Sequence, residues 1–200
     1  MKRKLFLVIF ALSIASLSFG QKMFTFGPKV GIIQNDLTTN WDTIKTAAKT
    51  NLEIGAFMRF SGAGIYFQPE LLYVTKGGVI QNSSMTVKQE VAIQAIDVPL
   101  MFGLKIGAKS FNLRFHGGPV CSFTVNKTID TSHGDSFIKE EDFNDINYSA
   151  QVGAGIDVLF LSLDVRYEYG INSIYKGSGI TNNMSLNQNN YNISLAFKLL

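Results

Sequence analysis

Residues 161–170 read LSLDVRYEYG, a strict alternation of apolar and polar side chains. Asp164, Arg166 and Glu168 fall on one parity, and the apolar residues between them fall on the other. Successive side chains of a β-strand point to opposite faces, so this pattern predicts a strand whose two faces meet different solvents. The fold therefore depends on which of the two faces is turned outward.

The same alternation recurs along most of the chain and predicts about eight strands of roughly ten residues each. The predicted strands are residues 24–33, 51–60, 64–75, 94–105, 111–125, 147–158, 161–170 and 191–199. No apolar run after residue 20 approaches the roughly 18 residues that a membrane helix needs. We therefore predict an all-β fold, an eight-stranded antiparallel up-and-down transmembrane β-barrel.

The connections between the predicted strands alternate between long and short. The long ones are polar and irregular, at residues 36–50, 76–89, 126–146 and 172–188. The short ones are at residues 61–63, 106–110 and the junction near Leu159. With both termini on the periplasmic side, every long connection lies outside the cell, which is the asymmetry typical of outer-membrane barrels.

The N-terminus has the features of a secretory signal peptide. Lys2, Arg3 and Lys4 precede a short apolar stretch, and small residues end it at Gly20. We predict a signal peptide at residues 1–20 and one barrel domain at residues 21–200. The three basic residues also account for the whole formal charge of +3. The exported chain is then formally neutral, so it lacks the clustered basic face that nucleic-acid binding needs.

The apolar face is the better candidate for the outside of the barrel. A soluble lipocalin-like carrier would use the same alternation with its apolar face inward, so the pattern alone leaves that alternative open. However, bulky Phe, Leu, Ile, Val and Tyr side chains would overfill an eight-stranded interior. The polar face instead combines charges with small residues, including Gly27, Gly31, Gly55, Gly103, Gly118, Gly153 and Gly155. We therefore expect lipid against the apolar face and a location in the cell outer membrane.

Aromatic residues gather at the two ends of the predicted strands. Tyrosines fall near the extracellular boundary, at Tyr73, Tyr148, Tyr167, Tyr169 and Tyr191. Phenylalanines fall toward the periplasmic ends, at Phe24, Phe26, Phe60, Phe67, Phe102, Phe111 and Phe197. Rings with a polar tip suit the membrane–water interface, so the two sets predict aromatic girdles. The ordinary strand propensity of aromatic residues is the alternative explanation.

The charged residues on the inward face need partners, because an unpaired ion in a confined interior is costly. The predicted lumen ion-pair network comprises Lys29, Glu53, Arg59, Glu70, Asp97, Arg114, His116, Asp157, Asp164, Arg166 and Glu168. Lys105 is a further inward base. Their near balance of charge favours a closed, paired lumen over an open pore. We expect Arg114 and Arg166 each to meet carboxylates from neighbouring strands.

Four short segments resemble a known family. They are QPELLY at 68–73, IDVPL at 96–100, GGPV at 117–120 and LDVRY at 163–167. In this order, and over nearly the whole chain after residue 20, they resemble the outer-membrane β-barrel domain of PorT-like proteins. The resemblance implies an integral outer-membrane barrel of Gram-negative bacteria, and some members of that family are linked to protein secretion and gliding.

Catalytic and metal-binding signals are weak in this sequence. His133 lies beside Ser132 and Asp135, but sequence neighbours in a loop rarely form a preorganised catalytic triad. His116 on the inward face is expected to be a hydrogen-bonded lumen residue. The acidic run at residues 140–142 lacks the spacing of a calcium loop. We therefore predict no catalytic residue, no metal and no cofactor.

The function predicted from these observations is that of a non-enzymatic outer-membrane barrel with a closed lumen. Its extracellular loops would serve binding, envelope support or a secretion-related role. The expected partners are outer-membrane lipid and a protein reached through the loops, with no nucleic acid, and the chain is expected to be a monomer. Two alternatives stay open, a lipid-modifying barrel enzyme and the soluble lipocalin-like carrier.

Overall fold

The computed structural model describes residues 23–39, 44–82, 88–108, 110–131, 144–173 and 186–199. The predicted signal peptide and His133 lie outside these ranges. Almost all of the described residues belong to β-strands. Within these ranges there is no helix of the length and apolar character that a membrane crossing requires.

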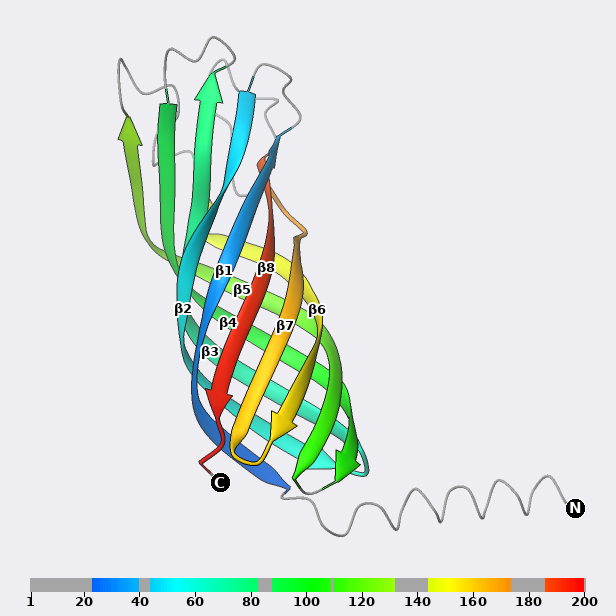
Figure 1. The fold of residues 1–200 in the computed structure, drawn as a ribbon. Helices are drawn as coiled ribbons and strands as arrows, with labels where there is room; N and C mark the ends of the chain where they lie inside the picture. The colour runs from blue at the N-terminus through cyan, green and yellow to red at the C-terminus, as the bar shows by residue number, and fades with distance from the viewer. Residues whose placement is uncertain are drawn as a thin grey trace, which may run out of the picture.

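The described residues form a closed β-barrel of eight strands (Figure 1). The strands are β1 (Phe24–Thr39), β2 (Ile44–Gly62), β3 (Ile65–Asn82), β4 (Lys88–Ala108), β5 (Phe111–Thr131), β6 (Ile146–Val158), β7 (Leu161–Gly170) and β8 (Leu186–Phe197). Each strand pairs antiparallel with the next, and β8 returns to pair with β1. Closure satisfies the backbone hydrogen bonds that lipid cannot. The predicted eight-stranded up-and-down barrel is confirmed.

Tight turns join the strands at one end of the barrel, which we call the periplasmic end after the predicted orientation, and we call the opposite end extracellular. Ala63 and Gly64 connect β2 to β3 with positive φ angles of 51° and 81°. Two central residues with positive φ match the twist of a hairpin, and glycine adopts such a conformation without a steric penalty. Leu159 and Phe160 connect β6 to β7. The short connections predicted at these places are therefore confirmed.

The first five strands are longer than predicted. They have 16, 19, 18, 21 and 21 residues, whereas β6, β7 and β8 have 13, 10 and 12. The prediction of long irregular connections at residues 36–50 and 76–89 was wrong, because strand pairing continues well into both. Beyond the membrane both faces of a strand meet water, so the strand continues without the apolar alternation. Figure 1 shows the ends of β2 to β5 projecting beyond β6 and β7.

The register turns the polar face of each strand into the lumen. Along β7, Asp164, Arg166 and Glu168 are buried, whereas Val165 is 52% exposed on the outer surface. The same holds around the barrel, where most exposed large side chains are apolar. An apolar outside and a charged inside is the reverse of a soluble carrier. The lipocalin-like alternative is therefore contradicted.

Candidate functional site

The lumen is filled with charged side chains from several strands. Among the described residues, the buried cations are Lys29, Arg59, Lys76, Arg114 and Arg166, and the buried carboxylates are Glu53, Glu70, Asp97, Asp157, Asp164 and Glu168. His116 is buried with them, while Lys105 is only half-buried near the periplasmic end of β4. The charged side chains form three clusters, which we call periplasmic, central and extracellular.

The periplasmic cluster consists of Arg59, Arg114, Asp157 and Ser162, close to the short turns. Arg59 Nη1 and Arg114 Nε each donate to an oxygen of Asp157 at 2.8 Å. Ser162 Oγ accepts from Arg59 Nη2 at 3.2 Å and from Arg114 Nη2 at 2.8 Å, and it donates to Asp157. The cluster therefore connects β2, β5, β6 and β7 through charge-assisted hydrogen bonds, which are stronger than neutral ones.

A glycine in the wall lets this cluster form. Arg114 Nη1 lies 3.0 Å from Asp164 Oδ1, and Gly155 is paired with both residues in the sheet. A Cβ atom at Gly155 would collide with the Asp164 carboxylate and the Arg114 guanidinium. The absence of a side chain there leaves the space in which the ion pair lies. Arg114 thus meets Asp157 of the neighbouring β6 and Asp164 of β7, one strand further away.

The central cluster consists of Lys29, Glu70 and Arg166. Arg166 donates through Nη1 and Nη2 to the two oxygens of Glu70, at 3.0 and 2.6 Å. Lys29 Nζ donates to the same carboxylate at 2.8 Å. A two-point guanidinium–carboxylate pair fixes geometry as well as energy. Because Glu70 lies in β3 and Arg166 in β7, the pair spans the lumen.

The prediction that Arg166 meets a carboxylate of a neighbouring strand was wrong. Its register partners are Gly153 in β6 and Asn192 in β8, and neither supplies a carboxylate. On β6, only the Gln151 side-chain oxygen accepts a hydrogen bond from Arg166, at 3.3 Å. The long arginine side chain therefore reaches across the lumen to β3.

Glu53 is the least well partnered of the buried carboxylates. Lys29 Nζ lies 3.9 Å from its Oε1 atom, and Asn192 Nδ2 donates to Oε2 at 3.4 Å. The Oε1 atom has no hydrogen-bond partner among the described residues. Glu53 therefore lies beside the central cluster without a close cation of its own.

The extracellular cluster contains a residue that sequence reasoning missed. Lys76 Nζ lies 2.6 Å from Asp97 Oδ2 and 3.0 Å from Glu168 Oε1. Ser149 and Gln151 donate to Glu168 at 2.8 and 2.6 Å. Lys76 was assigned to a long connection, which was wrong, because it is a buried residue of β3. Gln68 and Glu70 point inward, and every second residue after them does the same. This alternation reaches Lys76 and is the sequence signal that could have identified it.

A patch of apolar residues also faces the lumen. Ile33, Leu72, Val74 and Ala95 are at most 2% exposed and pack against one another. They belong to the inward parity of β1, β3 and β4, close to the extracellular cluster, since Leu72 is the register partner of Asp97. This apolar lumen cluster breaks the polar alternation, so the sequence pattern gave no sign of it.

Tyr66 and His116 fill the space between the charged clusters. The Tyr66 ring lies 5.3 Å from the Arg59 guanidinium carbon and 6.0 Å from that of Arg114. Its hydroxyl is 2.7 Å from His116 Nδ1, and His116 Nε2 is 3.6 Å from Asp164 Oδ1. His116 is therefore enclosed by lumen side chains rather than presented to lipid or solvent.

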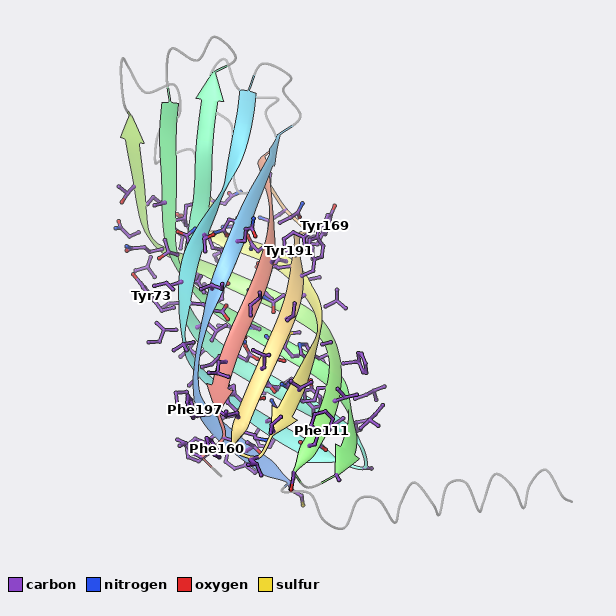
Figure 2. All side chains as sticks on the ribbon, in the orientation of Figure 1. Tyr73, Phe111, Phe160, Tyr169, Tyr191 and Phe197 are labelled. Atoms are coloured by element: carbon purple, nitrogen blue, oxygen red, sulfur yellow. The ribbon has the colours of Figure 1, made fainter. Side chains whose placement is uncertain are left out.

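The outer surface carries aromatic residues at both ends (Figure 2). Tyr73, Tyr169 and Tyr191 lie toward the extracellular end, and Phe111, Phe160 and Phe197 toward the periplasmic end. We call these sets the tyrosine belt, with Tyr148 and Tyr167, and the phenylalanine belt, with Phe24, Phe60, Phe67 and Phe102. Rings pair within both, at 5.0 Å for Tyr167 and Tyr191 and 4.7 Å for Phe67 and Phe102. The belts bracket the apolar band as interfacial girdles do.

The described lumen side chains contact one another in hydrogen bonds and ion pairs. Among the residues that the structure describes, no group of three or more His, Cys, Asp or Glu side chains is placed to hold a metal ion. Ser132, His133, Asp135 and the acidic residues 140–142 lie outside those ranges. The lumen side chains bind one another across strands far apart in sequence, so they hold the barrel together and fill its interior.

Comparison with known protein families agrees with the barrel fold. The sequence profile of the family described as "Outer membrane protein beta-barrel domain" matches residues 15–176. No curated protein matches the chain in sequence.

Several solved structures have a similar fold. OprG from Pseudomonas aeruginosa has a TM-score of 0.58 at 11% identity, over 90% of this chain and 98% of its own. Neisserial surface protein A has a TM-score of 0.46 at 11% identity, over 87% of this chain and 97% of its own. Ail of Yersinia pestis has a TM-score of 0.42 at 10% identity, over 89% of this chain and 100% of its own. The likeness to OprG shows a shared fold alone.

Proposed function

Because the chain belongs to the outer membrane protein beta-barrel domain family and resides in the outer membrane, we propose that it acts there without catalysis, as a closed barrel that presents its extracellular ends to binding partners. The observation that carries the closed lumen is the set of ion pairs that cross it. They join β3 to β7 twice, through Glu70–Arg166 and Lys76–Glu168, and β2 to β6 through Arg59–Asp157.

The crossing pairs support a barrier to ions at three levels. A solute that passes through the lumen has to separate at least one buried pair. Leaving a buried charge without its partner costs about 3–5 kcal/mol. Beside the extracellular cluster, the apolar lumen cluster of Ile33, Leu72, Val74 and Ala95 adds a stretch that water enters reluctantly.

Conductance across a planar lipid bilayer tests the closed lumen. The wild-type barrel is expected to give no discrete current steps under conditions in which a general porin conducts. A variant with Arg166→Ala and Glu70→Ala removes the central pair but keeps the other two crossing pairs, so we expect it to conduct only when Arg59→Ala and Lys76→Ala are added. The matched control Val165→Leu alters the outer face of the same strand and should stay silent. Discrete steps from the wild type would contradict a closed lumen.

The absence of catalysis is a separate part of the proposal. In the described part of the chain, His116 is buried and bonded to Tyr66, which supports a structural role for it. The lipid A and phospholipid composition of cells that produce the protein is expected to equal that of cells without it. A change in acyl chains that disappears with His133→Ala or His116→Ala would instead favour a lipid-modifying enzyme.

A further inference from the structure

Two lysines lie at the periplasmic end of the lumen, next to the periplasmic cluster. Lys105 belongs to the inward face of β4, where its register partner on β5 is Arg114. Lys198 follows β8, and its backbone N–H donates to the Phe160 carbonyl in the β6–β7 turn at 2.7 Å. Lys105 is half-buried, and the Lys198 side chain is 15% exposed. Neither lysine is therefore sealed off from the water at this mouth of the barrel.

Cations outnumber carboxylates at this end. The cations of the described residues here are Arg59, Lys105, Arg114 and Lys198. Three of them share the Asp157 carboxylate, with Lys198 Nζ at 3.7 Å, and Asp164 pairs with Arg114 at 3.0 Å. Lys105 interacts with Asp157 at longer range and, among the described residues, has no carboxylate in direct contact. Four positive charges thus face two negative ones, an excess of two positive charges.

The excess charge is not neutralised by the rest of the lumen. Lys105 stands directly opposite Arg114 on the neighbouring strand, and like charges in that position destabilise a sheet. At the extracellular end the balance is reversed, because Lys76 alone lies between Asp97 and Glu168. The central cluster separates the two ends. The positive end therefore attracts an anion from the solution at its own mouth.

A hydroxyl without a partner lies at the same end. Ser61 is the last inward residue of β2, two positions beyond Arg59. It is buried, and its Oγ atom has no hydrogen-bond partner among the described residues. A buried hydroxyl without a hydrogen bond is costly, and an anion accepts strongly from a hydroxyl. Ser61 is therefore a further donor for an anion at this end.

We propose that the periplasmic mouth of the lumen, formed by Lys105, Lys198 and Ser61, binds a phosphate group. Phosphate groups carry about one to two negative charges and several strong acceptor oxygens, which match the excess positive charge and the available donors. Lysine binds phosphate well as a point charge. The phosphate has two possible sources, the headgroup of a phospholipid beside the phenylalanine belt and a small soluble phosphate. The inference goes beyond the proposed external binding and does not depend on it.

Calorimetric titration with inorganic phosphate tests the site. The barrel is purified from membranes in a neutral, phosphate-free sugar detergent. The double variant Lys105→Gln with Lys198→Gln should bind phosphate at least roughly ten-fold more weakly than the wild type, because two charged donors are lost. Lys105→Arg with Lys198→Arg keeps both charges and should retain binding. Lys127→Gln removes a lysine at the opposite end and is the matched control, and heat-dependent gel mobility shows that each variant folds.

The unfolding midpoint separates binding from a structural role of Lys105. Without phosphate, Lys105→Gln should raise the midpoint, because the charge opposite Arg114 is removed. Phosphate should raise the midpoint of the wild type and have much less effect on the variant, since a ligand stabilises the state that binds it. A lower midpoint for Lys105→Gln with an unchanged response to phosphate would overturn the proposal. An equal response of the wild type to chloride at the same ionic strength would also overturn it, because it would show screening alone.

Native mass spectrometry distinguishes the two sources of phosphate. The barrel is released from the same micelles after phosphatidylglycerol has been added, with and without excess inorganic phosphate. A lipid that the wild type retains, the double glutamine variant loses and phosphate displaces would assign the site to a headgroup. Phosphate binding without lipid retention would assign it to a soluble phosphate. If neither binds, the proposal fails, whereas the closed lumen is tested separately by conductance.

Discussion

Val165 and Arg166 are consecutive residues of β7, yet they depend on different kinds of interaction. Val165 lies on the outer face, between its register partners Ala154 and Ile193, and is wetted by lipid. Arg166 is 2% exposed and holds the Glu70 carboxylate across the lumen. The outer face needs only apolar character at the right depth. The inner face needs particular partners, so the same strand combines a tolerant surface with an exacting one.

Removing the inner partner should have the largest effect. Arg166→Leu leaves Glu70 with Lys29 as its remaining cation and deprives Asp164 of a second guanidinium at 3.7 Å. We expect a loss of about 3–5 kcal/mol in the free energy of unfolding, because a buried charge loses its partner. Denaturant titration of the barrel in lipid vesicles measures the loss, with unfolding followed by far-ultraviolet circular dichroism.

A double variant separates charge pairing from packing. Arg166→Leu with Glu70→Leu removes both members of the pair, although Lys29 is then left with Glu53 at 3.9 Å. The double variant should still lose less than the two single variants added together. Strict additivity would show that the two side chains act independently. It would contradict the claim that inner-face residues depend on particular partners.

Placing a charge on the outer face should have the next largest effect. Val165 is midway along β7 between the two aromatic belts, and Val165→Arg turns a guanidinium into the hydrocarbon. The expected loss is about 2–4 kcal/mol, as for basic residues near the bilayer midplane. Val165→Leu, measured in the same vesicles, should stay within about 1 kcal/mol of the wild type. Equal stability of Val165→Arg and Val165→Leu would mean that lipid does not wet this face.

The difference between the two faces also explains how much the sequence predicts. Residues 161–170 are bounded by lipid on one side and the lumen on the other, so their alternation identifies both the strand and its inward charges. Above the tyrosine belt this contrast disappears, and the upper parts of β1 to β5 were assigned to loops. Lys76 was missed for that reason.

Partners across the lumen are beyond the reach of local pattern. Glu70 and Arg166 are 96 residues apart, and only closure of the barrel brings β3 opposite β7. Leu72 and Val74 were missed for another reason. Their inward position interrupts the polar parity of β3, because the strand crosses from a charged to an apolar part of the lumen.

Two glutamates on the inner face should respond differently to the loss of charge. Glu70 accepts from Arg166, Lys29 and Gln68, whereas Glu53 has Lys29 at 3.9 Å and Asn192 at 3.4 Å. Glu70→Gln should lose about 1.5–3 kcal/mol of unfolding free energy, since hydrogen bonds to charged groups disappear. Glu53→Gln should change stability by less than about 1 kcal/mol. Similar losses for both variants would show that burial of the side chain, rather than its hydrogen-bond partners, determines the change in unfolding free energy.

The smallest expected effect comes from deleting one hydroxyl on each face. Tyr66→Phe removes the hydrogen bond between Tyr66 Oη and His116 Nδ1 inside the lumen, and it should lower the unfolding free energy by about 1 kcal/mol, because the buried imidazole loses a partner. Tyr169→Phe makes the same chemical change in the tyrosine belt, where water and headgroups replace the lost contact. Its effect should stay within about 0.5 kcal/mol. Chevron analysis of both variants in the same lipid resolves the difference in unfolding free energy. A larger loss for Tyr169→Phe would contradict the claim that the inner face depends more on particular partners than the outer face does.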